Sequence, residues 1–226
     1  IEAPRRALIQ IVSPLVAEAI NKNNIHDLND LLKKSSVNLL LVAGLFFVLI
    51  NANINDLYDF IFWLNGKEGF ALAIPVVLYI SVTKLFTAIT GCTDNIITNS
   101  RYYYSVPFLS IGSAIAVVYL NLHFIELLGF VGAAIATLIV ISGFNIIKIA
   151  LIAKWYGLTP FSTATVYLIL LILGTYIPFA YWELPYSAFI NLIIKSGLII
   201  LVYLFVCVRA NFSPTVNAFL LNFYKK

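Results

Sequence analysis

Five charged residues stand inside stretches of the sequence that are otherwise long and apolar: Glu2, Arg5, Arg6, Lys84 and Lys195. A charged side chain at the middle of a bilayer costs about 2.5–3.5 kcal/mol on insertion scales. Four cations facing lipid would therefore cost on the order of 10 kcal/mol. We expect these cations to face the interior of a helix bundle or a water-filled cavity. A cationic surface there suits an anionic substrate, such as a phosphate or pyrophosphate head group.

Each of these charges also has a plainer interpretation. Glu2 precedes Arg5 and Arg6 by three and four residues, so a local ion pair could neutralise one charge. The two lysines could extend toward the membrane interface, and Lys148, near the end of its apolar segment, is expected to do so. Since no second acid occurs in the middle of a predicted span, we still expect the interior to be cationic.

Conventional catalysis finds little support in the sequence. The two histidines, His26 and His123, lie in separate predicted loops, and neither belongs to a residue arrangement with metal-site or catalytic-triad spacing. Cys92 and Cys207 are isolated thiols, typical of packing residues in membrane helices. No P-loop, nucleic-acid-binding motif or dense basic patch is present. We therefore predict no enzyme activity, no catalytic residue, no metal site, no cofactor and no nucleic-acid partner.

Composition places the chain among integral membrane proteins. Of its 226 residues, 62% are hydrophobic and only 11% are charged, and the mean hydropathy is +0.97. Soluble domains contain roughly 45–50% apolar and about 25% charged residues. The sequence contains no methionine and begins inside a helix-like apolar pattern, so we expect it to be a fragment that lacks its N-terminal part.

The hydrophobic pattern predicts an all-α, multi-spanning helix bundle. A membrane-spanning helix needs roughly 20 mostly apolar residues, and by this rule the chain has one partial and six complete spans. The connections are short and leave no room for a second domain. The partial span covers residues 1–20, and the complete spans cover 37–54, 70–91, 104–122, 129–152, 163–181 and 187–208.

Two segments, 24–36 and 213–224, are amphipathic and too polar to span a membrane. In the second, Ser213 can cap a helix and Pro214 suits its first position. We expect both segments to be helices that lie at the membrane interface. Aromatic residues near the span ends are typical of the interfacial belt of membrane proteins, among them Trp63, Trp155, Trp182 and Tyr186.

Charged residues of the connections predict the orientation. One set of connections is strongly basic and contains Lys22, Lys33, Lys34, Arg101, Lys154, Arg209, Lys225 and Lys226. The alternate set has one lysine among acids and contains Lys67, Asp56, Asp59, Glu68, Glu126 and Glu183. Because cytoplasmic loops are enriched in Lys and Arg, we expect the first set and the C-terminus to be cytoplasmic.

Small residues recur at three- and four-residue spacing at the start of the span that covers residues 129–152. On a helix, Gly129, Gly132, Ala133 and Ala136 would form one bare stripe. Hydrophobicity contributes little to helix association in lipid, so close packing across small residues becomes important. We expect a neighbouring helix to pack against this stripe.

Four stretches, in the same order along the chain, resemble polysaccharide-export flippases. That family carries lipid-linked oligosaccharides such as O-antigen units and belongs to the multidrug/oligosaccharidyl-lipid/polysaccharide (MOP) exporter superfamily. The first stretch runs from Pro4 to Glu18 and the second is Leu31-Leu-Lys-Lys-Ser35. The third is Gly91 followed by Ile96-Ile-Thr-Asn-Ser-Arg-Tyr-Tyr-Tyr104, and the fourth is Gly129-Phe-Val-Gly-Ala-Ala-Ile-Ala-Thr137. A departure is Leu128, where such proteins often carry proline.

The resemblance implies that the chain is the C-terminal lobe of a two-lobed carrier whose N-terminal lobe is missing. Its expected partners are that lobe, membrane lipids and a lipid-linked oligosaccharide, with H⁺ or Na⁺ as the candidate coupling ion. The implied function is translocation of undecaprenyl-pyrophosphate-linked sugars across the bacterial inner membrane, by alternating access, for surface polysaccharide or O-antigen export.

Two alternatives remain open at the level of sequence. A cation-coupled multidrug exporter of the same superfamily would need acidic residues inside its spans, and the predicted interior is cationic. A membrane-embedded glycosyltransferase or acyltransferase would need a cluster of His, Asp or Glu at a membrane face, and the sequence shows none.

Overall fold

The computed structural model describes residues 2–66, 73–182 and 185–210, and all regular secondary structure within them is helical. In chain order the helices are α1 (Glu2–Asn21), α2 (Ile25–Ala52), α3 (Ile54–Asn65), α4 (Ala73–Ile89), α5 (Thr93–Asn99), α6 (Ser105–Leu128), α7 (Phe130–Tyr156), α8 (Thr163–Ala180) and α9 (Ala188–Ala210).

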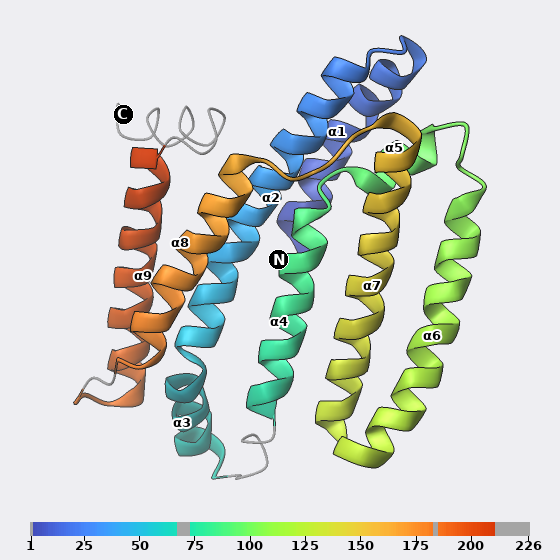
Figure 1. Cartoon of the computed structure of the whole chain (residues 1–226). Coiled ribbons are helices and arrows are strands. Elements are labelled where there is room, and N and C mark those ends of the chain that lie inside the picture. Colours follow the sequence, from blue (N-terminus) through green and yellow to red (C-terminus); the bar gives the residue numbers. More distant parts are fainter. Residues whose placement is uncertain (1, 67–72, 183–184, 211–226) are drawn as a thin grey trace.

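Six of these helices stand side by side in the order α9, α8, α2, α4, α7, α6 (Figure 1). α1 packs along α2 and against α5, and α3 packs on α9. The order in space differs from the order in the chain, because α2 inserts between α4 and α8. The main apolar core therefore joins distant segments, with Leu40 and Val48 of α2 packed with Leu168 of α8 and Tyr203 of α9.

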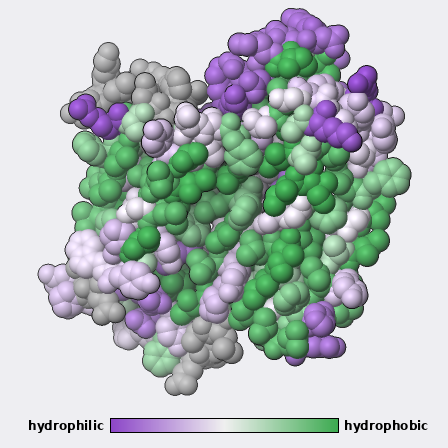
Figure 2. Space-filling view, in the orientation of Figure 1, coloured by the Kyte–Doolittle hydropathy of each residue, from purple (hydrophilic) through white to green (hydrophobic). Residues whose placement is uncertain are grey.

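Five of the described helices are long and apolar enough to cross a membrane, and there are six if the bent pair of α4 and α5 is counted as one span. Figure 2 shows apolar surface over the middle of the molecule and hydrophilic surface toward its two ends. This distribution suits a protein embedded in a bilayer. Each complete span predicted from the sequence overlaps one of these helices: α2, α4, α6, α7, α8 or α9.

The structure refines the prediction for the first 52 residues. α1, predicted as a partial span, is not among the helices that are long and apolar enough to cross a membrane, since Arg5, Arg6 and Glu18 interrupt its apolar residues. The predicted interfacial helix 24–36 is instead the first part of α2, which continues without a break to Ala52.

Packing explains why the helix does not end at residue 36. Leu28, Leu32, Ser35 and Ser36 of this segment are buried, partly against α1, so their face is covered by protein rather than by the membrane interface. The hairpin of α1 and α2 extends beyond the ends of α7 and α8 (Figure 1). The other predicted interfacial helix, 213–224, lies outside the described residues.

A break between α4 and α5 bends the chain by 51°. Gly91 supplies a φ of 56° there, and a Cβ at this position would lie 2.7 Å from Ser35 Oγ of α2. The backbone groups freed by the break find partners on α2. The Ser36 hydroxyl donates to the carbonyl of Ile89 at 2.7 Å, and the Cys92 N–H donates to Ser35 Oγ at 3.0 Å. These bonds satisfy backbone groups that lipid could not.

α6 and α7 form a tight hairpin around the small residues singled out in the sequence. Gly129 lies in the turn before α7 with a φ of 61°, where added side-chain atoms would meet open space. Gly132 is buried, and a Cβ on it would lie 1.9 Å from the Phe124 carbonyl oxygen at the end of α6. Ala136 is fully buried and Ala133 is partly buried. The close contact is therefore centred on Gly132, and Gly129 serves the turn.

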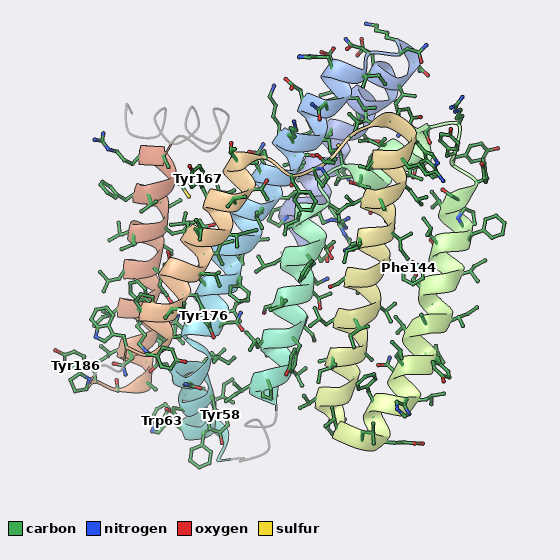
Figure 3. All side chains as sticks on the ribbon, in the orientation of Figure 1. Tyr58, Trp63, Phe144, Tyr167, Tyr176 and Tyr186 are labelled. Atoms are coloured by element: carbon green, nitrogen blue, oxygen red, sulfur yellow. The ribbon has the colours of Figure 1, made fainter. Side chains whose placement is uncertain are left out.

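Aromatic side chains mark one end of the bundle. Tyr58 and Trp63 of α3 lie near Tyr186, which precedes α9, at the end of the molecule opposite the α1–α2 hairpin (Figure 3). The Trp63 side chain is among the most exposed apolar groups of the described residues. At the other end, the rings of Tyr102 and Trp155 stack with centroids 4.2 Å apart. Both positions suit an interfacial belt of aromatic residues.

The orientation predicted from the basic loops can be tested at the two ends of the α6–α7 hairpin. Glu126 is exposed at the end of α6, beside the turn into α7, and Lys154 is exposed at the opposite end of α7. The native Cys92 and Cys207 are buried. A membrane-impermeant thiol reagent applied to intact cells should label Glu126→Cys and leave Lys154→Cys unlabelled until the cells are opened. Labelling of Lys154→Cys alone in intact cells would reverse the predicted orientation.

Candidate anion-binding site

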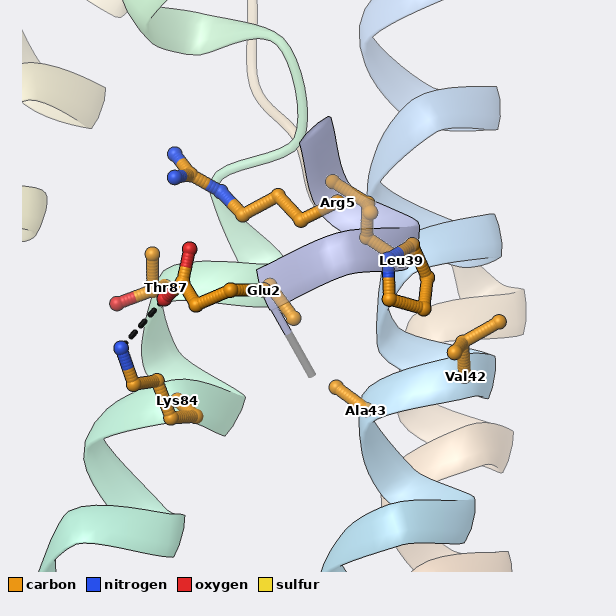
Figure 4. A pocket seen from close by; sticks show the side chains of 9 residues that line it. Glu2, Arg5, Leu39, Val42, Ala43, Lys84 and Thr87 are labelled. Carbon is orange, nitrogen blue, oxygen red and sulfur yellow. Dashed lines mark hydrogen bonds and ion pairs between the residues drawn. The ribbon is translucent and has the colours of Figure 1, made fainter. Parts of the chain in front are cut away.

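Charged residues from α1 and α4 meet at a pocket beside α2 (Figure 4). Glu2 and Lys84 form an ion pair there. The guanidinium of Arg5 extends to the same side of the pocket, away from Leu39 and Ala43, which form the apolar wall on α2 (Figure 4). α1 packs along α2, and α2 packs against α4, so this packing brings Glu2 of α1 to Lys84 of α4.

Asp94 of α5 connects this pocket to α7. One carboxylate oxygen, Oδ2, lies 3.3 Å from the Arg5 guanidinium, and the other, Oδ1, lies 2.9 Å from Lys148 Nζ. One carboxylate thus bridges cations from two helices that are far apart in the sequence. The bend at Gly91 directs α5 toward α1 and α7, and this makes the bridge possible.

The cluster carries an excess of positive charge. Three cations contact two carboxylates in it, which leaves one net positive charge: Arg5, Lys84, Lys148, Glu2 and Asp94. The neighbouring Arg6 is exposed and forms no ion pair with any described residue. The cluster is also partly open, with 26% of the Lys148 side chain and 42% of the Asp94 side chain accessible.

Arg5 retains hydrogen-bonding capacity within the cluster. Its Nε is buried and has no hydrogen-bond partner among the described residues. Asn145 of α7 donates to the hydroxyl of Thr87, a residue of α4 that lines the same pocket, at 3.3 Å and joins those two helices. A guanidinium carries five N–H donors in a planar fork, so the partly accessible Arg5 side chain can bind a phosphate through two parallel hydrogen bonds.

Lys195 of α9 does not belong to this cluster. It lies with Asp56 of α3, at 2.7 Å from Nζ to Oδ2, and only 6% and 11% of the two side chains are accessible. Asn191 donates a further hydrogen bond to Asp56. Of the four cations predicted to face one cavity, Arg5 and Lys84 share a pocket, Arg6 is exposed beside it and Lys195 is buried elsewhere.

The structure brings to the interior acids that the predicted spans do not contain. Asp56 and Asp94 lie outside the predicted spans, yet the fold brings both carboxylates to cations inside the bundle. Lys148, which was expected to extend toward the interface, forms an ion pair with Asp94. In the sequence, Gly91 was the one signal that Asp94 could reach the bundle, because a glycine at the end of a span can turn the chain back into the bundle.

Within residues 2–66, 73–182 and 185–210, no group of three His, Cys, Asp or Glu side chains lies close enough to hold a metal ion. Comparison of the chain with protein-family models, curated proteins and solved structures gives no match. The resemblance to polysaccharide-export flippases therefore stays a prediction based on the four sequence stretches, and the geometry of the cluster is the independent basis for a functional proposal.

Proposed function

We propose that this chain is one lobe of a membrane carrier that moves a lipid-linked oligosaccharide across the bacterial inner membrane. The substrate would be an undecaprenyl-pyrophosphate-linked sugar, and its pyrophosphate would bind the cations of α1, α4 and α7. A second lobe would face the cluster, and rocking of one lobe against the other would expose the site to each side in turn.

The observation that carries this proposal is the charge excess of the cluster. Burying cations in an apolar bundle is costly, so a cluster needs a reason to hold more cations than carboxylates. Binding an anion supplies that reason. The excess, the partly open side chains and the guanidinium fork of Arg5 all suit a multiply charged phosphate ligand.

A cation-coupled multidrug exporter is the second candidate, because Asp56 and Asp94 supply the acidic residues that such a protein needs inside its bundle. Each of these carboxylates already contacts a lysine or an arginine, so neither presents free negative charge to a cationic drug. The pairing favours an anionic substrate, and transport assays with the two kinds of substrate separate the candidates.

The proposal predicts that the Arg5 fork is needed for transport. Arg5→Ala and Arg5→Lys in the full-length protein should each lower translocation of an undecaprenyl-pyrophosphate-linked saccharide in proteoliposomes by about ten-fold or more, since a hydrogen bond to a charged group contributes about 1.5–3 kcal/mol. Lys cannot reproduce the bidentate geometry, so the conservative change should not restore transport.

Lys154→Ala is the matched control for this test, because it removes an exposed cation at the end of α7, away from the cluster. It should transport normally, and all variants should reach the membrane in equal amounts. Full transport by Arg5→Ala, or transport of a cationic drug that depends on Asp94, would favour the exporter instead.

A further inference from the structure

Asp94 occupies the cations that a phosphate would need. Both of its carboxylate oxygens are engaged, Oδ2 with Arg5 at 3.3 Å and Oδ1 with Lys148 at 2.9 Å. A phosphate group that bound the same two cations would replace these oxygens one for one. The carboxylate and a multiply charged phosphate repel each other at such short range, so both cannot hold the pair.

We propose that Asp94 is an internal counter-ion of the site, which holds Arg5 and Lys148 in the empty carrier and is displaced by the pyrophosphate of the substrate. This inference rests on the proposed function. Without a counter-ion, the two cations would lie unpaired at a bundle surface when no substrate is present, which is unfavourable in an apolar surrounding. With a counter-ion, binding exchanges one set of ion pairs for another, and release restores the first.

Asp94 suits this role better than Glu2. Glu2 forms a one-to-one pair with Lys84, whereas Asp94 is shared by two cations on different helices. Asp94 also lies on the short helix α5, which is separated from α4 by the 51° bend. Its side chain is 42% accessible, so its carboxylate can leave the cluster by a rotation of the side chain while α5 stays packed through Ile96 and Ile97.

The contacts of α5 with α2 position Asp94 in the empty state. Ser35 and Ser36 bind the backbone on both sides of Gly91, and side-chain atoms added at Gly91 would collide with Ser35 Oγ and the Ser36 backbone. The break is thus fixed to α2, and Asp94, the second residue of α5, lies two positions after Cys92 on a helix that packs against α1 and α7. These serines act as positioning residues for the counter-ion.

Binding measurements on the purified full-length protein test this proposal. Asp94→Asn keeps the size of the side chain and removes its charge, so it should bind pyrophosphate at least about five-fold more tightly than the natural protein. Asp94→Glu keeps the charge and should bind with an affinity close to that of the natural protein. The two probes are inorganic pyrophosphate, and undecaprenyl pyrophosphate in lipid nanodiscs. If Asp94→Asn binds only the second probe more tightly than the natural protein does, the lipid-linked form is identified as the ligand.

A measurement on the natural protein covers the case in which Asp94→Asn does not fold. Amide hydrogen exchange in residues 93–99 should become faster when pyrophosphate binds, because α5 loses two ion pairs. Slower or unchanged exchange there, or equal or weaker binding by a folded Asp94→Asn protein, overturns the counter-ion role.

The two proposals fail in different ways. Weaker pyrophosphate binding by Lys148→Ala and Arg5→Ala, together with unchanged binding by Asp94→Asn, would keep the proposed function and remove only the counter-ion. Unchanged binding by Lys148→Ala and Arg5→Ala would remove the anion site itself.

Discussion

Replacing Lys195 with alanine is expected to lower the free energy of unfolding by about 3–5 kcal/mol, the usual cost of leaving one partner of a buried ion pair uncompensated. Lys195 and Asp56 are both nearly inaccessible and lie 2.7 Å apart. Without the ammonium group, the Asp56 carboxylate would remain inside the contact between α3 and α9. Chemical or thermal unfolding in detergent measures the effect.

A double variant is the matched control for the Lys195 prediction. Asp56→Asn with Lys195→Met removes both charges, keeps an oxygen that can accept the hydrogen bond from Asn191, and should be close to the natural protein in stability. A Lys195→Ala protein as stable as this double variant would show that the ion pair contributes nothing to the fold. Loss of transport in the stable double variant would instead assign the pair a functional role.

Replacing Gly132 with alanine or leucine should also destabilise the protein, by about 1–3 kcal/mol and more for leucine, as overpacking of a tight contact does. The added Cβ would lie 1.9 Å from the backbone oxygen of Phe124. A backbone oxygen cannot move away as the end of a flexible side chain can, so the α6–α7 hairpin must open. The melting temperature in detergent measures this change.

Gly143 is the matched control because it lies on the same helix, α7, and a Cβ there would meet open space. Gly143→Ala should preserve or raise the melting temperature, since alanine favours a helix by about 1 kcal/mol over glycine in its interior. Equal melting temperatures for Gly132→Ala and Gly143→Ala would mean that the close approach of α6 and α7 is not needed for stability.

Charge pairing explains how this apolar bundle accommodates its ionisable residues. Lys84, Lys148 and Lys195 each contact a carboxylate supplied by another helix. Pairing of this kind lowers the cost of placing charge at bundle depth. The buried pair of α3 and α9 therefore has a structural interpretation, whereas the partly open cluster of α1, α4, α5 and α7 retains positive charge for a ligand.

The protein class and most of the helices could be predicted from local sequence. Long apolar runs predict spanning helices directly, because each helix satisfies its own backbone in lipid and needs no distant partner to form. Six predicted ranges therefore overlap described helices. The single cations within those runs were equally visible, since a charge among apolar residues stands out without knowledge of the fold.

The pairing of the charges, in contrast, depends on how the helices pack. Asp56 and Asp94 seemed to belong to loops, and nothing in their local sequence relates them to Lys195, or to Arg5 and Lys148. The insertion of α2 between α4 and α8, the packing of α1 on α2 and the bend at Gly91 create these contacts. Local apolar periodicity specifies where a helix forms, but the partners of its polar side chains depend on how the helices pack. That packing is set by long-range contacts such as those of Ser35 and Ser36 with the break after Ile89.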